Sequence, residues 1–155
     1  MIRRATIEDY DRIKEIMTDD STYPYGIDDG CPSSGEYNPT VILSDDRIYV
    51  LLPDNNSVAL FVPINHINYD VHICALPESR GKNKLWFDSI EYMFTKTPCE
   101  KITARIPEGN QLAYAIAKKT GFVNEGISMK SIKINGALRD TILLGITKEE
   151  WKCLS

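Results

Sequence analysis

The chain has 155 residues, enough to bury one hydrophobic core and too few to divide comfortably into two domains. Its 43% hydrophobic and 26% charged residues exclude a chain too polar to collapse, so we expect a single domain over residues 1–155. The net charge of -4, from 18 Lys and Arg against 22 Asp and Glu, repels a polyanion and argues against nucleic-acid binding.

Cysteine spacing and apolar content set the expected environment. The four cysteines, Cys31, Cys74, Cys99 and Cys153, form no C-x-x-C pair and have no histidine at metal-ligand spacing, so we expect neither a metal site nor a disulfide framework. The N-terminal residues lack the apolar stretch of a signal peptide, and no run is apolar enough to span a membrane. These features predict a reduced, cytoplasmic protein with no membrane contact.

The first forty residues predict a strand, a helix and a long loop. Residues 2–6 are a short strand candidate, and Thr6 begins a near capping box followed by apolar residues at helical spacing. That apolar set is Ile7, Tyr10, Ile13, Ile16 and Met17. Residues 19–40 are rich in Pro and Gly, which indicates an irregular segment with at most a short helix. Its carboxylates, at Asp28, Asp29 and Glu36, either bind a cationic amine or keep the loop soluble.

The rest of the chain predicts an antiparallel meander, a helix, a strand, a second helix and a hairpin. The meander strands are residues 48–52, 58–64 and 69–76. A helix over residues 82–95, a strand over 101–106 and a helix over 111–120 follow. Residues 127–134 and 137–146 flank Asn135-Gly136, which favours a type I′ hairpin turn. Thr147 then caps a final turn that contains Trp151.

The segment that joins the third meander strand to the next helix suggests a phosphate cradle. A strand-to-helix turn directs free backbone N–H groups to one place, where the helix dipole adds positive charge. Arg80, Lys82 and Lys84 are too close together to follow a nucleic-acid duplex, but they suit one phosphorylated small molecule. Turns with Arg and Gly also occur merely to redirect a chain, so this segment alone leaves both interpretations open.

Several motifs between residues 71 and 151 are shared with a known superfamily. They are Pro-Glu-Ser-Arg-Gly-Lys at 77–82, Asn110-x-x-Ala113 and Gly121-Phe122, and together they resemble the coenzyme A-binding half of the GNAT N-acetyltransferases. Gly126, Asn135-Gly136-x-x-Arg139-Asp140 and Glu149-Glu150-Trp151 are similar to the C-terminal hairpin of ribosomal-protein N-terminal acetyltransferases. Val71-His72-Ile73 with Arg105-Ile106-Pro107 is similar to acetyltransferase-like proteins carried by bacteriophages.

The resemblance implies a fold and a binding cleft. The fold is α/β, the GNAT fold, with a mixed, mostly antiparallel central sheet, a splayed parallel strand pair and flanking helices. Acetyl-CoA, as cosubstrate, is expected where the strand ending at Leu76 separates from the strand starting at Lys101. The residues implied to bind it are Ile73, Cys74, Ala75, Leu76, Arg80, Gly81, Lys82, Asn83, Lys84, Leu85, Asn110 and Ala113. Asn110 also suits plain N-capping of the helix that it precedes.

Acetyl transfer to an amine needs a base that works near neutral pH, and His72 is the candidate. The alternative for His72 is a structural histidine hydrogen-bonded within the sheet. Family members often place a Tyr, as acid for the leaving thiolate, where this chain has Ala117. Tyr114 and Ser128 are the candidate substitutes, and packing beside the sheet is the alternative for Tyr114.

Two hypotheses about function remain open from the sequence. The first is an N-acetyltransferase that acetylates a primary amine, either a peptide N-terminus or a small molecule. The second is a GNAT-fold protein without catalysis that binds or assembles with phage structural proteins, motivated by Asn83, Leu85 and Ala117 at positions where the family pattern differs. The exposed hairpin edge suggests a homodimer. The expected location is the cytoplasm, that of the host for a phage protein, or the virion under the second hypothesis.

Overall fold

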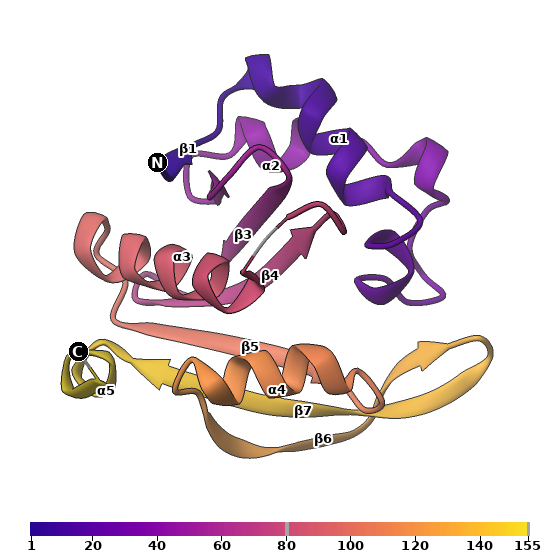
Figure 1. Ribbon diagram of the computed structural model, residues 1–155. Helices are drawn as coiled ribbons and strands as arrows, with labels where there is room; N and C mark the ends of the chain where they lie inside the picture. Colours follow the sequence, from indigo (N-terminus) through magenta and orange to yellow (C-terminus); the bar gives the residue numbers. More distant parts are fainter. Residues whose placement is uncertain (80, 155) are drawn as a thin grey trace.

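The computed structural model describes residues 1–79 and 81–154, and in this part of the chain one seven-stranded sheet is flanked by helices (Figure 1). The strands are β1 Arg3–Arg4, β2 Tyr49–Leu52, β3 Ser57–Pro63, β4 Asn68–Ala75, β5 Lys101–Pro107, β6 Val123–Ile134 and β7 Ala137–Thr147. The α-helices are α1 Tyr10–Thr18, α2 Thr40–Ser44, α3 Lys82–Lys96, α4 Gln111–Lys119 and α5 Lys148–Leu154. Short 3-10 turns occupy Ile7–Asp9, Tyr23–Tyr25 and Ser34–Glu36. The strand order is β1-β2-β3-β4-β5-β7-β6.

The predicted elements are confirmed, with two corrections. The strand β6 begins at Val123, four residues before the predicted start at residue 127. Ile7 was expected on the buried stripe of the first helix, but it lies in a 3-10 turn and is 59% exposed. In that turn the backbone N–H of Thr6 donates to the carboxylate of Asp9, at 2.9 Å, and the tighter geometry directs Ile7 to solvent. The buried residues of the helix are Ile13 and Ile16.

Two hydrophobic clusters pack on opposite faces of the sheet. The larger joins β2 to β5 and β7 with α3 and α4, and it includes Phe61, Ile90 and Phe122. The smaller lies between α1 and the other face of β2 to β4, with Ile13 and Leu60 as members. Figure 1 shows α3 and α4 over one side of the sheet and α1 toward the other. In the described part of the chain, α1 packs on β3 and β4, α3 packs on β3, and α4 packs on β5.

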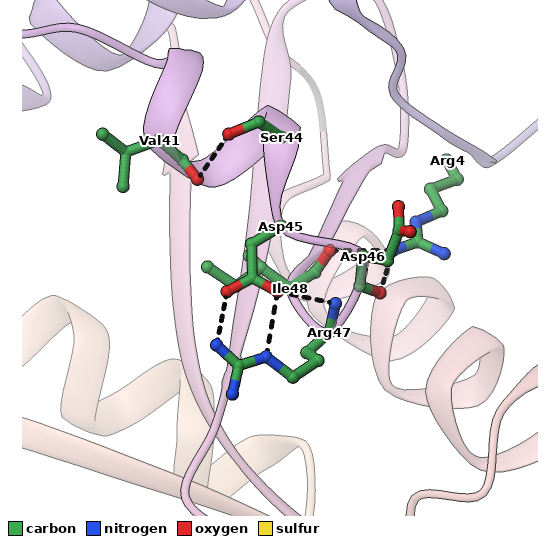
Figure 2. Close-up of polar contacts among 7 residues, drawn as sticks. All are labelled: Arg4, Val41, Ser44, Asp45, Asp46, Arg47 and Ile48. Carbon is green, nitrogen blue, oxygen red and sulfur yellow. Dashed lines mark hydrogen bonds and ion pairs between the residues drawn. The ribbon is translucent and has the colours of Figure 1, made fainter.

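Polar contacts in the turn before β2 fix the short first strand, as Figure 2 shows. The Arg4 guanidinium donates through Nη2 to the carbonyl oxygens of Asp46, at 2.7 Å, and Ile48, at 2.9 Å. Within the same turn, Arg47 donates through Nε and Nη2 to the Asp45 carboxylate, at 3.0 and 2.8 Å. These hydrogen bonds lower the pKa of Asp45 to about 2. The two-residue edge strand β1 is thus held by side-chain hydrogen bonds as well as by its backbone pairing with β2.

The parallel strands β4 and β5 separate after three residue pairs. Asn68 faces Lys101, Tyr69 faces Ile102 and Asp70 faces Thr103, and the pairing ends there. Beyond that point β4 stays paired to β3 as far as Ala75, and β5 stays paired to β7 as far as Pro107. Figure 1 shows the two strands diverging toward their C-terminal ends. This is the splayed parallel pair that the sequence predicted.

Two further findings concern the described residues. In residues 1–79 and 81–154, no helix is long and apolar enough to cross a membrane. Within the same residues, no three His, Cys, Asp or Glu side chains are grouped so that they could hold a metal ion.

Candidate functional site

A cavity of about 1360 Å³ lies where β4 and β5 separate, and both faces of the sheet contribute to its wall. Successive strand residues point to opposite faces. On the α3 and α4 face the wall residues from β4 and β5 are Val71, Ile73, Ala75, Ala104 and Ile106. On the other face they are Asp70, His72, Cys74, Arg105 and Pro107. The cavity therefore passes through the sheet, so two molecules that enter from opposite faces can meet inside it.

The N-terminus of α3 lies at the edge of this cavity. Gly81 precedes the helix with φ of 68°, a left-handed conformation that favours glycine. The first helical hydrogen bond runs from the Leu85 N–H to the Gly81 carbonyl, at 3.1 Å, so the amides of residues 82–84 have no acceptor within the helix. Lys82 and Leu85 contribute to the cavity wall. Free amides, a helix dipole and a lysine together suit a phosphate group.

The loop before α3 is fixed by a carboxylate from the β2–β3 turn. Ser79 donates through Oγ to Oδ2 of Asp54, at 2.8 Å, and Ser57 donates to Oδ1, at 2.6 Å. Burial acts to raise the pKa of Asp54, but these hydrogen bonds and that of the Asn56 amide outweigh it and keep the pKa below its ordinary value. Ser79, three residues before α3, is therefore held by an ionised carboxylate.

Leu85 and Trp86, the bulky residues at the start of α3, do not fill the cavity. Both are buried, and both form part of its wall. Trp86 packs edge-on against Phe122, with ring centroids 5.7 Å apart. Asn83 lies outside the wall and borders a separate hollow of about 460 Å³ beside Lys119. The departures at Asn83 and Leu85 therefore leave room in the cleft.

Asn110 begins α4 in the way that its N-cap interpretation predicted. The Ala113 N–H donates to Oδ1 of Asn110, at 3.3 Å. Asn110 and Ala113 both contribute to the cavity wall. The side chain of Asn110 thus orients the first turn of α4 and borders the cavity at the same time.

A charged cluster occupies the opposite face at the point where the strands separate. Arg105 donates to Oδ2 of Asp70 through Nη2, at 2.5 Å, and through Nε, at 3.2 Å. The Nε2 atom of His72 lies 3.3 Å from the same oxygen. The Asp70 side chain is 5% exposed, whereas those of His72 and Arg105 are 46% and 55% exposed. The buried carboxylate therefore orients two side chains that reach solvent within the cavity.

The charge of Asp70 follows from its partners. Burial acts to raise its pKa, but hydrogen bonds from His72 and Arg105, together with the charge of Arg105, hold the pKa below its ordinary value. Its second oxygen, Oδ1, is buried and has no hydrogen-bond partner among the described residues. An ionised Asp70 accepts a hydrogen bond from Nε2 of His72, which leaves Nδ1 as the ring atom with a lone pair.

The long loop between α1 and α2 covers this charged face. The wall includes Thr22, Tyr25 and Asp28 from the loop. The two carboxylate oxygens of Asp29 accept hydrogen bonds from the backbone N–H groups of Asn135 and Gly136, each at 2.8 Å. Asp29, considered from the sequence as an amine-binding group, is instead committed to the tip of the β6–β7 hairpin. The loop is thereby tied across the cavity.

Of the remaining predicted residues, some border the cavity and others do not. The cavity wall includes Ile73, Cys74, Ala75, Lys82, Leu85, Asn110, Ala113, His72 and Ser128. Burial raises the pKa of Cys74 to about 11, so its thiol stays protonated. Leu76 packs under α1 in the smaller cluster instead of bordering the cavity, and Gly81, Asn83 and Lys84 also lie outside the wall. Arg80 lies outside the described residues.

Tyr114 lies away from the cavity that it was predicted to serve. Its hydroxyl accepts a hydrogen bond from Nδ2 of Asn124, at 3.0 Å, and the residue is absent from the cavity wall in the described structure. Tyr114 also packs against the larger core, as its alternative interpretation expected. Ser128, on β6, borders the cavity and faces Thr141 across the hairpin. Of these two predicted residues, only Ser128 therefore borders the cavity in the described structure.

Sequence reasoning assigned no role to Asp70 or Arg105, which hold the base candidate in place. A signal for Asp70 was present, because an acid within the apolar run of β4 is seldom buried unless it has a partner. It also shares the strand face of His72, two residues later. Its partner Arg105 is 35 residues away, and only the register of β4 and β5 brings the two together.

Comparisons with known proteins identify the fold. No family model matches the sequence, and a search of curated proteins found no match. Spermidine N-acetyltransferase from Vibrio cholerae, solved in complex with CoA and spermine, is similar with a TM-score of 0.79 and 21% identity over 98% of this chain and 97% of that chain. Ribosomal-protein-S5-alanine acetyltransferase from Vibrio fischeri is similar with a TM-score of 0.74 and 18% identity, over 97% of this chain and 93% of that chain.

Both similar proteins are acetyltransferases of the GNAT fold. The chain therefore has the GNAT fold, as its motifs predicted. The mixed sheet with one splayed parallel pair is the feature that defines it here.

Proposed function

We propose that this protein transfers the acetyl group of acetyl-CoA to a primary amine. The observation that carries the proposal is the cavity through the sheet, which has a phosphate-suited helix start on one side and a histidine held by a buried carboxylate on the other. The shared fold supports it, since one similar protein was solved with CoA and the amine spermine. The fold alone does not determine the substrate, so the proposal is based on the residues of the cavity.

Acetyl-CoA enters from the α3 and α4 face. Its pyrophosphate accepts hydrogen bonds from the first-turn amides of α3, with Lys82 adding positive charge. The pantetheine arm lies between β4 and β5, past Asn110 and Ala113. The thioester then reaches the residues of β4 beyond Asp70, which have no β5 partner. A backbone N–H within residues 73–75 stabilises the oxyanion of the tetrahedral intermediate.

The amine arrives from the opposite face, where His72 acts as base. An ammonium has no lone pair, so Nδ1 of His72 first removes one proton. The amine nitrogen then attacks the carbonyl carbon, the N–C bond forms, and the C–S bond breaks. His72 releases the first proton to solvent and then takes the second proton, which the nitrogen loses after the attack, and releases it in the same way. Ser128 donates its hydroxyl proton to the thiolate and is reprotonated from solvent. Each turnover thus consumes one ammonium and one thioester and yields one amide, one thiol and one free proton.

A thiol-release assay with matched variants tests the proposal. Wild-type protein is incubated with acetyl-CoA and a panel that contains a peptide with a free N-terminus, spermidine and L-amino acids. Ala113→Leu narrows the cavity, whereas Ala115→Leu adds the same volume on an exposed part of the same helix. We expect amine-dependent thiol release by wild type and Ala115→Leu, and at least a tenfold loss for Ala113→Leu.

Absence of transfer to every amine, together with absence of acetyl-CoA binding, would overturn the proposal. It would favour instead the binding or assembly protein suggested by Asn83, Leu85 and Ala117. Ala117 is fully buried in the larger core and supplies no proton donor. A homodimer, a phage source and phage structural partners stay predictions from the sequence.

A further inference from the structure

Arg105 presents unused hydrogen-bond donors beside the proposed base. A guanidinium carries five N–H groups in a flat fork. Its Nε and one N–H of Nη2 are directed to Asp70, and the described residues supply no acceptor for Nη1 or for the second N–H of Nη2. The two N–H groups at this end are parallel, so they suit a carboxylate bound through two hydrogen bonds. The exposed side chain lies in the cavity wall, so a substrate can reach it.

The open end of Arg105 lies next to His72. Both side chains donate to the same oxygen of Asp70, from strands that have just separated. Both also occupy the charged face that the loop covers, opposite the proposed entry of acetyl-CoA. An amine that reaches His72 therefore has a fixed guanidinium beside it.

The other charges of the cavity do not create a site for a polycation. In the described part of the chain, the acids in the wall are Asp28, Asp70 and Glu108, and the permanent cations are Lys82, Arg105 and Arg139. Asp70 is bound by Arg105, and Oδ1 of Asp28 accepts hydrogen bonds from the Gly30 amide, at 2.8 Å, and from the Cys31 thiol, at 3.6 Å. Acidic and basic groups are equal in number, so the wall offers no surplus of negative charge to a polyamine.

We infer that the acceptor is an amine that carries a carboxylate on the neighbouring carbon, as an α-amino acid does. This inference rests on the proposed function and narrows its acceptor. The carboxylate binds the open end of Arg105, and the amine, one carbon away, faces His72. Each charged group of the substrate then has a partner in the site. Its carboxylate binds the guanidinium of Arg105, and its ammonium gives a proton to His72.

Matched sets of acceptors test the inference on the intact protein. The α-amino acids of proteins that have a primary amine are compared with their carboxamides, and the simplest also with their decarboxylated amines, in the acetyl-CoA thiol-release assay. The carboxamide keeps the side chain and the primary amine and removes only the negative charge. We expect kcat/KM to be at least tenfold higher for the best amino acid than for its carboxamide.

Variants assign the preference to Arg105. The ratio of kcat/KM for the amino acid to kcat/KM for its carboxamide is expected to fall to about one in Arg105→Gln. In Arg105→Lys the ratio is expected to lie between the values of wild type and Arg105→Gln, because an ammonium lacks the planar fork of a guanidinium. Arg139→Gln is expected to keep the preference. The ratio is measured within one variant, so a fraction of unfolded protein cancels. Calorimetric titration of the amino acid into wild type and Arg105→Gln, both saturated with CoA, gives a second readout that needs no turnover.

Two results separate this inference from the proposed function. Acetylation of carboxamides, peptides or spermidine at rates equal to or above those of amino acids would overturn the inference and leave the transferase proposal intact. No transfer to any acceptor, with no binding of acetyl-CoA, would overturn both.

Discussion

The two sides of the cavity differ in the kind of group that they offer. The side under α3 and α4 presents small and apolar side chains from the strands, such as Ile73, Ala104 and Ile106, and backbone amides at the start of α3. The opposite side presents Asp70, His72 and Arg105 in one hydrogen-bonded cluster. Both sides belong to the same pair of strands, and alternation along each strand separates the two chemistries.

This difference separates two tasks. Backbone amides and apolar walls bind a long cosubstrate through shape, so bulky residues such as Leu85 are accepted there as long as the space stays open. Charged side chains act at defined atoms, so single substitutions on that side are expected to affect chemistry and acceptor choice. Substitutions on each side of the cavity can therefore test this division of tasks.

The largest effect is expected from His72→Gln. Removal of the base should lower kcat/KM for acetyl transfer by about 10²–10⁴-fold, because proton removal limits the supply of free amine. The dissociation constant of acetyl-CoA should be unchanged, since His72 lies on the other side of the sheet. The control is His66→Gln in the exposed β3–β4 turn. Equal kcat/KM for the two variants would show that His72 is structural.

A smaller effect is expected from Gly81→Ala on the cosubstrate side. The residue has φ of 68°, and an added Cβ meets nothing closer than 3.6 Å, so the cost is backbone strain of about 1–2 kcal/mol. We expect urea denaturation to show this loss and acetyl-CoA to bind more weakly, with kcat little changed. Gly35→Ala, with open space around it, is the control. A changed kcat with unchanged affinity would contradict the division of tasks.

Asp29→Ala releases the covering loop from the hairpin tip. Two hydrogen bonds to exposed backbone amides are lost, which costs about 1 kcal/mol. We expect KM for the amine to rise a few-fold while the affinity for acetyl-CoA is kept, as measured by initial rates and by calorimetry. Asp20→Ala, an exposed carboxylate in the same loop, is the matched control. Weakened acetyl-CoA binding in Asp29→Ala would contradict the assignment of the loop to the amine side of the cavity.

The smallest effect concerns acid stability. The pKa of Asp9, hydrogen-bonded to Arg3, is lowered to about 2, and the pKa of Asp70 is also lowered. A carboxylate with a lowered folded-state pKa stabilises the fold above its unfolded pKa of about 3.9, and this contribution is lost as pH falls through the folded pKa. The free energy of unfolding should therefore be flat for these groups from pH 5 to 8 and fall between about pH 4 and 2. A rise in that interval would contradict the assignment.

Sequence patterns predicted the elements that depend on local rules. Asn135 and Gly136 both have positive φ, 52° and 78°, as the type I′ hairpin turn requires. Asn110 caps α4, and Thr147 and Glu150 form a reciprocal cap for α5. The splayed pair was also predicted, but from the resemblance to a superfamily and not from periodicity.

The contacts that the sequence did not predict join residues that are far apart in the chain. The ion pair of Asp70 and Arg105 exists because β4 and β5 align with Asp70 opposite Thr103. Asp29 meets Gly136 across 107 positions of the chain. The direction of the Tyr114 side chain depends on how α4 is rotated about its own axis on the sheet. The apolar pattern of a helix fixes this rotation only to within about one residue. No local pattern encodes these three placements.

Calorimetric titration of the wild-type protein with acetyl-CoA measures whether the cavity between β4 and β5 binds the cosubstrate, on which the whole proposed transfer depends. We predict saturable binding at one site per chain, with a micromolar dissociation constant that Ala113→Leu weakens at least tenfold and Ala115→Leu leaves unchanged. No binding heat at millimolar acetyl-CoA, or equal affinity in the two variants, would contradict the account.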